Sequence, residues 1–118
     1  MELIVTTLAL LQLKHFLVDF LLQTPEMVIS KGIYMDMLGI VHSLQHAVIT
    51  VLIITFAVDS VAVGVACGFI DYVLHYHIDF IKVRFGNRDT TDTTFWHHLG
   101  LDQLLHQLTY IGLVYAAL

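Results

Sequence analysis

The sequence predicts an all-α integral membrane protein built as a four-helix up-down-up-down bundle, and three observations support this prediction. First, the 118 residues are 58% hydrophobic and only 13% charged, with a mean hydropathy of +0.81, whereas soluble domains contain about 25% charged residues. Second, four segments reach the length of about 20 mostly apolar residues that spans a bilayer. Third, short polar connections separate these segments, which makes consecutive helices antiparallel neighbours.

The first two predicted helices are delimited by a proline and a glycine. Residues 3–23 form a nearly continuous apolar run that stops before Pro25, because proline cannot continue a helix comfortably. Gly32 permits a terminating conformation, and residues 33–57 form the second run. The first run lacks the basic start and the small-residue cleavage site of a secretory signal. We therefore expect it to be part of the folded protein.

The third and fourth predicted helices complete the bundle. Residues 61–85 follow a turn of only three residues and end at Gly86. Residues 95–118 follow a polar connection, and Thr93 or Thr94 can cap the start of this helix.

The remaining composition narrows the class of protein. No linker, charge block or low-complexity tract interrupts the chain, so residues 1–118 are predicted to form a single domain. A lone Cys67 excludes an intrachain disulfide and a cysteine-rich zinc site. Gly64 and Gly68 lie four residues apart and allow a neighbouring helix to approach closely. The sequence has no basic patch of the kind that binds nucleic acid. A soluble bundle of this composition would expose too much apolar surface.

Each predicted helix carries polar residues four positions apart, a spacing that keeps side chains on one helix face. In an antiparallel bundle, the late parts of the first and third helices lie beside the early parts of the second and fourth. We therefore expect the four polar seams to meet in one buried cluster, off-centre in the membrane. The seams are His15, Asp19 and Gln23; His42, His46 and Thr50; Asp71, His75 and Asp79; and His98, Asp102, His106 and Tyr110.

Ionisable side chains inside a membrane need compensation, because each costs about 2.5–3.5 kcal/mol at the centre of a helix. A hydrogen-bonded His/Asp network is one solution, and metal ions bound by neutral imidazoles and carboxylates are the other. Ligation without thiolates suits zinc, with manganese or iron as alternatives, and the number of candidates suggests two ions because one site uses only three or four ligands. The predicted ligands are His15, Asp19, His42, His46, His75, Asp79, His98, Asp102 and His106.

Two further residues are predicted to act in catalysis. Asp71 lies nearest the membrane centre of its helix and is expected to orient a ligand or carry a proton. Lys82 is expected to pair with the negative charge of a substrate, and the alternative is a side chain that snorkels to the membrane interface. By the positive-inside rule, the basic residues place the end with the cluster in the cytoplasm and both termini outside. These basic residues are Lys14, Lys31, Lys82, Arg84 and Arg88.

The stretches HFLVDFLLQT, VHSLQHAVIT, HYHIDFIKVRFG and LDQLLHQL resemble a family of small polytopic membrane proteins of bacteria and phages, catalogued as a domain of unknown function. The resemblance covers most of the chain but implies no established activity, and Asp71 and His98 fall outside its pattern. A looser likeness to membrane-bound metal-dependent hydrolases implies hydrolysis by analogy. The residues that match the family pattern are His15, Asp19 and Gln23; His42 and His46; His75, Asp79 and Lys82; and Asp102, Gln103 and His106.

Together these features predict a metal-binding protein of a bacterial-type inner membrane that hydrolyses a lipid or lipid-linked phosphate ester. Membrane lipid is the expected partner, and assembly into a homo-oligomer is left as an alternative. One alternative is a metal-ion or proton transporter or channel, although the apolar half of the bundle argues against a path through a monomer. Another is a non-enzymatic membrane protein with a structural metal or a hydrogen-bond network. A redox diiron enzyme is disfavoured because the seams contain no glutamate.

Overall fold

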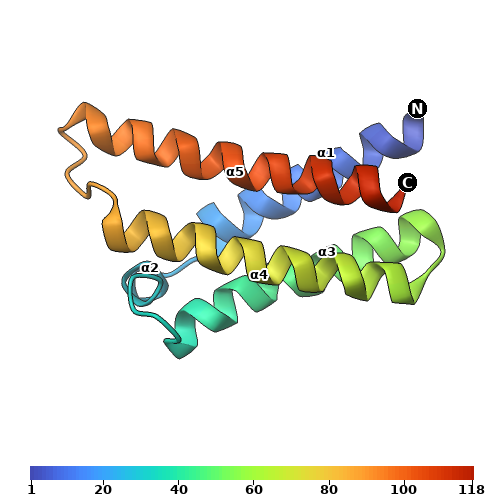
Figure 1. The fold of residues 1–118 in the computed structure, drawn as a ribbon, viewed down its shortest axis with the longest axis horizontal. Coiled ribbons are helices and arrows are strands. Elements are labelled where there is room, and N and C mark those ends of the chain that lie inside the picture. Colours follow the sequence, from blue (N-terminus) through green and yellow to red (C-terminus); the bar gives the residue numbers. More distant parts are fainter.

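The computed structural model describes all residues 1–118, and it contains helices and turns only (Figure 1). The prediction of an all-α chain is therefore confirmed. Four of the elements correspond to the predicted runs when α1 and η1 are taken together, and α2 lies in a segment predicted to be a connection. In chain order the elements are α1 (Glu2–Phe16), the π-helix η1 (Leu17–Leu22), α2 (Pro25–Ser30), α3 (Met37–Val58), α4 (Val61–Phe85) and α5 (Thr93–Ala117).

The long helices pack in a ring, in which α1 and α4 each contact both α3 and α5. Consecutive rods run in opposite directions, as Figure 1 shows. The two termini and the α3–α4 turn lie at one end, which we call the terminal end. The short α2 and the α4–α5 connection lie at the other, which we call the loop end. The prediction of a four-helix bundle is met only in part, because α2 adds a further helix.

Four helices start after a polar residue whose side chain accepts a hydrogen bond from a backbone N–H two or three residues later. Asp36 moves the start of α3 to Met37, four residues after the predicted start. Asp92 caps α5 in place of the two predicted threonines. These shifts leave the buried faces of both helices unchanged. The capping residues are Thr24, Asp36, Ser60 and Asp92.

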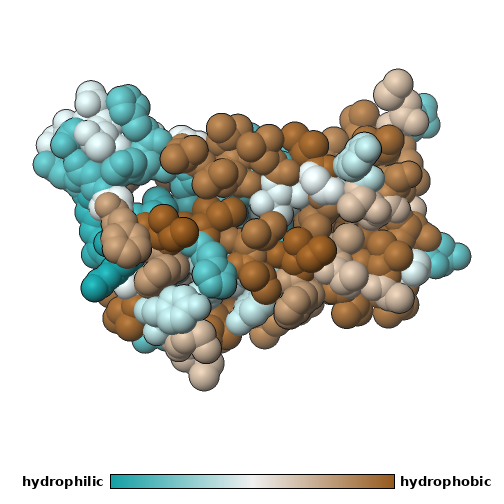
Figure 2. Space-filling view, in the orientation of Figure 1, coloured by the Kyte–Doolittle hydropathy of each residue, from teal (hydrophilic) through white to brown (hydrophobic).

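The molecule is apolar outside and largely polar inside. Of its 29 buried residues, 15 are polar or charged, while many leucine, isoleucine, valine and phenylalanine side chains are exposed. Figure 2 shows the hydrophobic surface over the length of the rods and a hydrophilic area at the loop end. This inverted distribution suits a lipid environment, because exposed apolar patches of this size are rare on soluble monomers.

Three helical segments are long and apolar enough to cross a membrane, namely Glu2–Leu22, Met37–Val58 and Val61–Phe85. They correspond to three of the four predicted spans. The fourth, α5, is as long as α4 but is not among them. It carries three histidines, two glutamines and Asp102, and these lower its hydropathy.

The α3–α4 contact is the closest in the bundle and confirms the predicted role of the two glycines. A Cβ atom at Gly64 would clash with the side chain of Thr55 and lie 2.8 Å from the carbonyl oxygen of Val51. A Cβ atom at Gly68 would lie 3.0 Å from the carbonyl oxygen of Ala47. Because backbone atoms cannot move aside easily, this contact requires glycine.

The interior has an apolar part and a polar part. The apolar part is a cluster from α1, α3, α4 and α5 that fills the bundle toward the terminal end. The polar seams occupy the remaining interior, toward the loop end. The apolar cluster consists of Leu11, Ile54, Cys67, Tyr110, Leu113 and Val114.

Candidate metal centre

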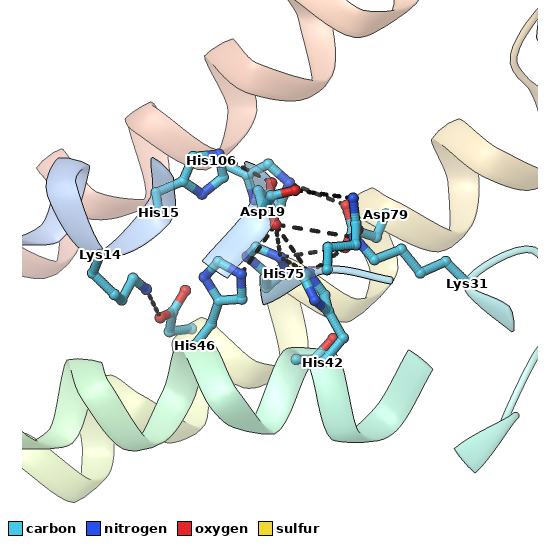
Figure 3. Close-up of polar contacts among 12 residues, drawn as sticks. Lys14, His15, Asp19, Lys31, His42, His46, His75, Asp79 and His106 are labelled. Carbon is cyan, nitrogen blue, oxygen red and sulfur yellow. Dashed lines mark hydrogen bonds and ion pairs between the residues drawn. The ribbon is translucent and has the colours of Figure 1, made fainter. Parts of the chain in front are cut away.

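The structure brings eight of the nine predicted metal ligands together in the polar interior (Figure 3). Each long rod supplies at least one of these side chains, and all eight are buried. They form three overlapping groups in which one ligand atom of each residue lies within 4.8 Å of the others. The groups are Asp19, His42, His46 and His75; His15, His75 and His106; and Asp79, Asp102 and His106.

The first group converges on a single carboxylate oxygen. Oδ1 of Asp19 lies 3.0 Å from Nε2 of His42, 3.1 Å from Nε2 of His46 and 3.6 Å from Nε2 of His75. The Nε2 atoms of His42 and His75 are 3.2 Å apart. The three imidazoles thus present the same ring nitrogen to one point, and none of them has measurable exposure.

The π-helix η1 carries Asp19 at this point. His15, four residues earlier in α1, contacts the second oxygen of Asp19 through its Nε2 at 3.2 Å. The other ring nitrogen of His15 is 2.9 Å from the hydroxyl of Tyr110 on α5. Short π-helical turns occur often at functional sites. Here η1 ends at Leu22, and the extended backbone of Gln23 leads the chain away from the cluster.

The third group lies toward the loop end. Nε2 of His106 is 3.4 Å from Oδ1 of Asp79 and 3.6 Å from Oδ1 of Asp102. Neither His106 Nε2 nor Asp102 Oδ1 has a hydrogen-bond partner, although both are buried. Buried polar atoms without partners are costly in free energy, so their grouping makes this a candidate site for a ligand.

Lys31 reaches the cluster from the connection after α2. Its ammonium lies 2.7 Å from Oδ2 of Asp79 and 4.0 Å from Oδ1 of Asp19. The junction that positions it is specific, because the hydroxyl of Ser30 donates to Asp36 and accepts from the backbone N–H of Gly39. These bonds fix the end of α2 against the start of α3.

Asp71 lies apart from the three groups and forms a buried ion pair with Lys14. Their charged atoms are 2.7 Å apart. The hydroxyl of Thr50 donates to the same carboxylate oxygen at 2.6 Å and accepts from Lys14 at 2.9 Å. Figure 3 shows the ammonium of Lys14 in this ion pair, separate from the contacts around Asp19. The predicted catalytic role of Asp71 has no geometric support in these contacts.

The other two predicted residues lie nearer the loop end. The ammonium of Lys82 is 3.7 Å from Oδ2 of Asp102, and its side chain is 29% exposed. His98 does not join the cluster. Its Nδ1 instead accepts a hydrogen bond from the backbone N–H of Asn87 at 2.9 Å, which ties the α4–α5 connection to the start of α5.

Lys14 and Lys31, two of the five basic residues on which the predicted orientation rests, are buried in ion pairs. The burial of Lys14 could be inferred from the sequence, because it shares a helical face with Thr7, Leu11 and Val18, all of which are buried. No feature of the sequence indicates that Lys31 is buried. Its partner Asp79 lies 48 residues later in the chain, on α4.

The first group has the dimensions of a tetrahedral zinc site. Ligand atoms about 2.0–2.1 Å from a zinc ion lie about 3.3 Å apart, close to the measured separations of 3.0–3.6 Å between Asp19 and the three imidazoles. The Nδ1 atoms of His42, His46 and His75 lack partners, whereas ligand histidines usually donate this N–H to a neighbouring group. The positions of the ligand atoms therefore fit a metal ion, but the surrounding side chains do not supply the usual acceptors for the Nδ1–H groups.

A polar cavity of about 130 Å³ adjoins the cluster. Asp19 and Asp79 line its buried side, while Lys82 and Gln23 are partly exposed. Lys31, Asp102 and Gln103 complete its polar lining. The cluster is therefore accessible from the loop end.

Comparison with known proteins identifies the family. The family model described as "Protein of unknown function (DUF3307)" matches residues 7–118. No curated protein and no solved structure matches the chain. The family match includes all four polar seams and confirms the resemblance inferred from their motifs. The chain belongs to the DUF3307 family.

Proposed function

We propose that this protein is a membrane-embedded, metal-dependent hydrolase that acts on a lipid or lipid-linked phosphate ester. A divalent ion, with zinc as the best fit, would bind Asp19, His42, His46 and His75. Hydrolysis would require this ion to expand to a fifth position for water, as catalytic zinc can do, and there it would lower the pKa of the water and polarise a phosphoryl oxygen. The four long rods would cross a bacterial-type inner membrane, with the loop end in the cytoplasm.

The convergence of three Nε2 atoms on one carboxylate oxygen carries this proposal. One carboxylate oxygen accepts about two hydrogen bonds through its two lone pairs, so it cannot pair well with three imidazoles at once. The 3.2 Å separation of the His42 and His75 nitrogens adds a second conflict, because only one of these two nitrogens can carry a hydrogen, so the two imidazoles cannot both donate to Asp19. A shared cation removes both conflicts.

The buried charges support one divalent ion. Asp19, Asp79 and Asp102 face two ammonium groups, those of the buried Lys31 and the partly exposed Lys82. With neutral imidazoles, these groups leave one net negative charge. One divalent ion would change it to one net positive charge, which an anionic substrate can neutralise. A second ion at Asp79, Asp102 and His106 would have to bind together with an anionic ligand.

The cavity provides the groups that ester hydrolysis requires. As the oxygen of a water molecule bonds to phosphorus, the carboxylate of Asp102, which lines the cavity, can take the proton of this water. The bond between phosphorus and the ester oxygen breaks, and the ammonium of Lys82 can protonate the departing alkoxide. The products are the lipid alcohol and a phosphate.

The apolar interior argues against transport. Leu11, Ile54, Tyr110 and their neighbours fill the bundle between the cluster and the terminal end. An ion or proton that crossed the membrane through one molecule would have to pass this packed layer. A reaction site open at the loop end alone fits the structure better.

The metal content of the purified protein tests this proposal. We expect stoichiometric divalent metal in protein extracted in detergent without chelators, and metal-dependent release of inorganic phosphate from phosphatidic acid. Asp19→Asn should lose the metal and the activity, because it removes the anionic ligand with little change of shape. His77→Gln is the matched control, since His77 is exposed on α4 and bonds only to Val73 and Tyr34.

The possible outcomes separate the alternatives. A metal-free protein would leave a hydrogen-bond network with protonated imidazoles and would end the proposal. Metal that is bound by the wild type and lost in Asp19→Asn, without hydrolysis of phosphate esters, would show a structural ion instead of a catalytic one.

A further inference from the structure

A continuous apolar groove runs between α4 and α5. It consists of two adjoining hollows of about 200 and 510 Å³, which share Ile78 and Leu105. The hollow nearer the loop end is lined by Ile81, Phe85 and Leu101, and the farther one extends to Gly112 and Ala116. From His98 to Ala116 this groove follows roughly 27 Å of α5, more than the depth of one membrane leaflet.

The groove adjoins the polar cavity of the candidate metal centre and shares two lining residues with it. Lys82 and Asp102 line both the apolar hollow near the loop end and the polar cavity. The two spaces therefore meet at an ion pair in which the charged atoms are 3.7 Å apart. A molecule that fits both must have a charged head and a long apolar tail.

We infer that the α4–α5 groove binds the hydrocarbon chain of a lipid whose single phosphate head group enters the polar cavity beside Lys82. The inference deepens the proposed function and rests on it for the chemistry of the head group. The chain would enter sideways from the bilayer, between two helices, without leaving the hydrocarbon region.

The polar cavity has room for the head group. Its volume of about 130 Å³ is sufficient for one phosphate group. Lys31 and Lys82 line this cavity together with Asp19, Asp79 and Asp102, so the divalent ion of the proposed function would leave one net positive charge for the phosphate.

The α3–α4 face also has an apolar hollow, of about 350 Å³, which is lined by Leu44, Val65 and Phe69 among others. This hollow shares no lining residue with the polar cavity. The α4–α5 groove shares two, so a lipid chain in it would have its head group beside the polar cavity.

Photo-crosslinking in phosphatidylcholine nanodiscs tests the inference. The probe is a phosphonate analogue of phosphatidic acid with a diazirine in its acyl chain, because its carbon–phosphorus bond resists hydrolysis. Phosphatidylcholine with the same diazirine is the reference lipid. We expect the phosphonate to label Ile78, Leu101 and Leu105 several-fold more than the reference does. Lys82→Gln should abolish this preference, and Arg84→Gln, which removes an exposed charge outside both spaces, should retain it.

The outcomes distinguish this inference from the proposed function. Equal labelling by both lipids, or equal labelling of Leu44 and Phe69 on the α3–α4 face, would show ordinary surrounding lipid and overturn the inference. Metal-dependent hydrolysis without preferred labelling of the groove would also overturn the inference alone. Preferred labelling of the groove in a protein that binds no metal would support the inference and overturn the metal-dependent mechanism.

Discussion

Individual buried charges divide the interior into two separate units. In one, Lys14 and Asp71 neutralise each other, and Thr50 bonds to both. In the other, the carboxylates outnumber the buried ammonium groups. Asp71 has its hydrogen bonds satisfied within its own unit, so its contacts suit a residue that fixes α1 against α4. This role explains why an acid near the membrane centre can lie outside the candidate centre.

The Lys14–Asp71 pair can be tested with single and double substitutions. Lys14→Met or Asp71→Leu alone should lower the free energy of unfolding by about 3–5 kcal/mol, because each leaves a buried charge without its partner. The double variant should lose much less and should keep its metal. Unfolding by SDS titration, followed by circular dichroism, measures the stability, and elemental analysis measures the metal. Loss of metal in a stable double variant would instead support a direct catalytic or ligand role for Asp71.

At the scale of residues, helical spacing correctly predicted that most of these histidines and aspartates meet in one cluster. Residues at i, i+4 and i+8 share a face whatever the details of packing, so His15 and Asp19, or His42 and His46, had to point the same way. His98 has the same spacing from Asp102, but it lies close to the start of α5 and bonds to Asn87 instead. The metal-binding role of the grouped residues stays a prediction.

At the scale of elements, the segment from η1 to α2 departs most from the sequence prediction. The first run continues helically to Leu22, but its last six residues form wider π-turns, for which no simple sequence signal exists. The short α2 does have a signal. Thr24 caps it and Pro25 occupies its first turn, where the missing N–H is harmless. Pro25 thus ends one helix and starts another.

The tight contact of α3 with α4 gives a prediction at the same scale. Gly68→Ala should destabilise the protein by about 1–3 kcal/mol, because the added methyl group would press on Val51 and on the carbonyl oxygen of Ala47. Gly100→Ala is the matched control. Its methyl group would meet nothing within 4 Å, so this variant should keep its stability or gain up to about 1 kcal/mol from helix propensity. Thermal unfolding in detergent compares the two, and equal melting temperatures would contradict the close approach.

At the scale of the whole molecule, the polar interior opens toward one end of the bundle only. Its exterior is apolar along the rods and hydrophilic at the loop end (Figure 2). Because Lys14 and Lys31 are buried, only Lys82, Arg84 and Arg88 remain as evidence for orientation. All three belong to the end of α4 or the connection that follows it, so they still favour a cytoplasmic loop end.

Cysteine accessibility in intact cells checks this orientation. In a Cys67→Ala background, Thr90→Cys places a thiol in the exposed α4–α5 connection, and Glu2→Cys places one near the terminal end. If the loop end is cytoplasmic, a membrane-impermeant maleimide should label the cysteine at position 2 from outside. It should reach the cysteine at position 90 only after the membrane is opened. The reverse pattern would place the candidate centre at the outer leaflet, where the substrate would have to be a lipid phosphate exposed outside the cytoplasm.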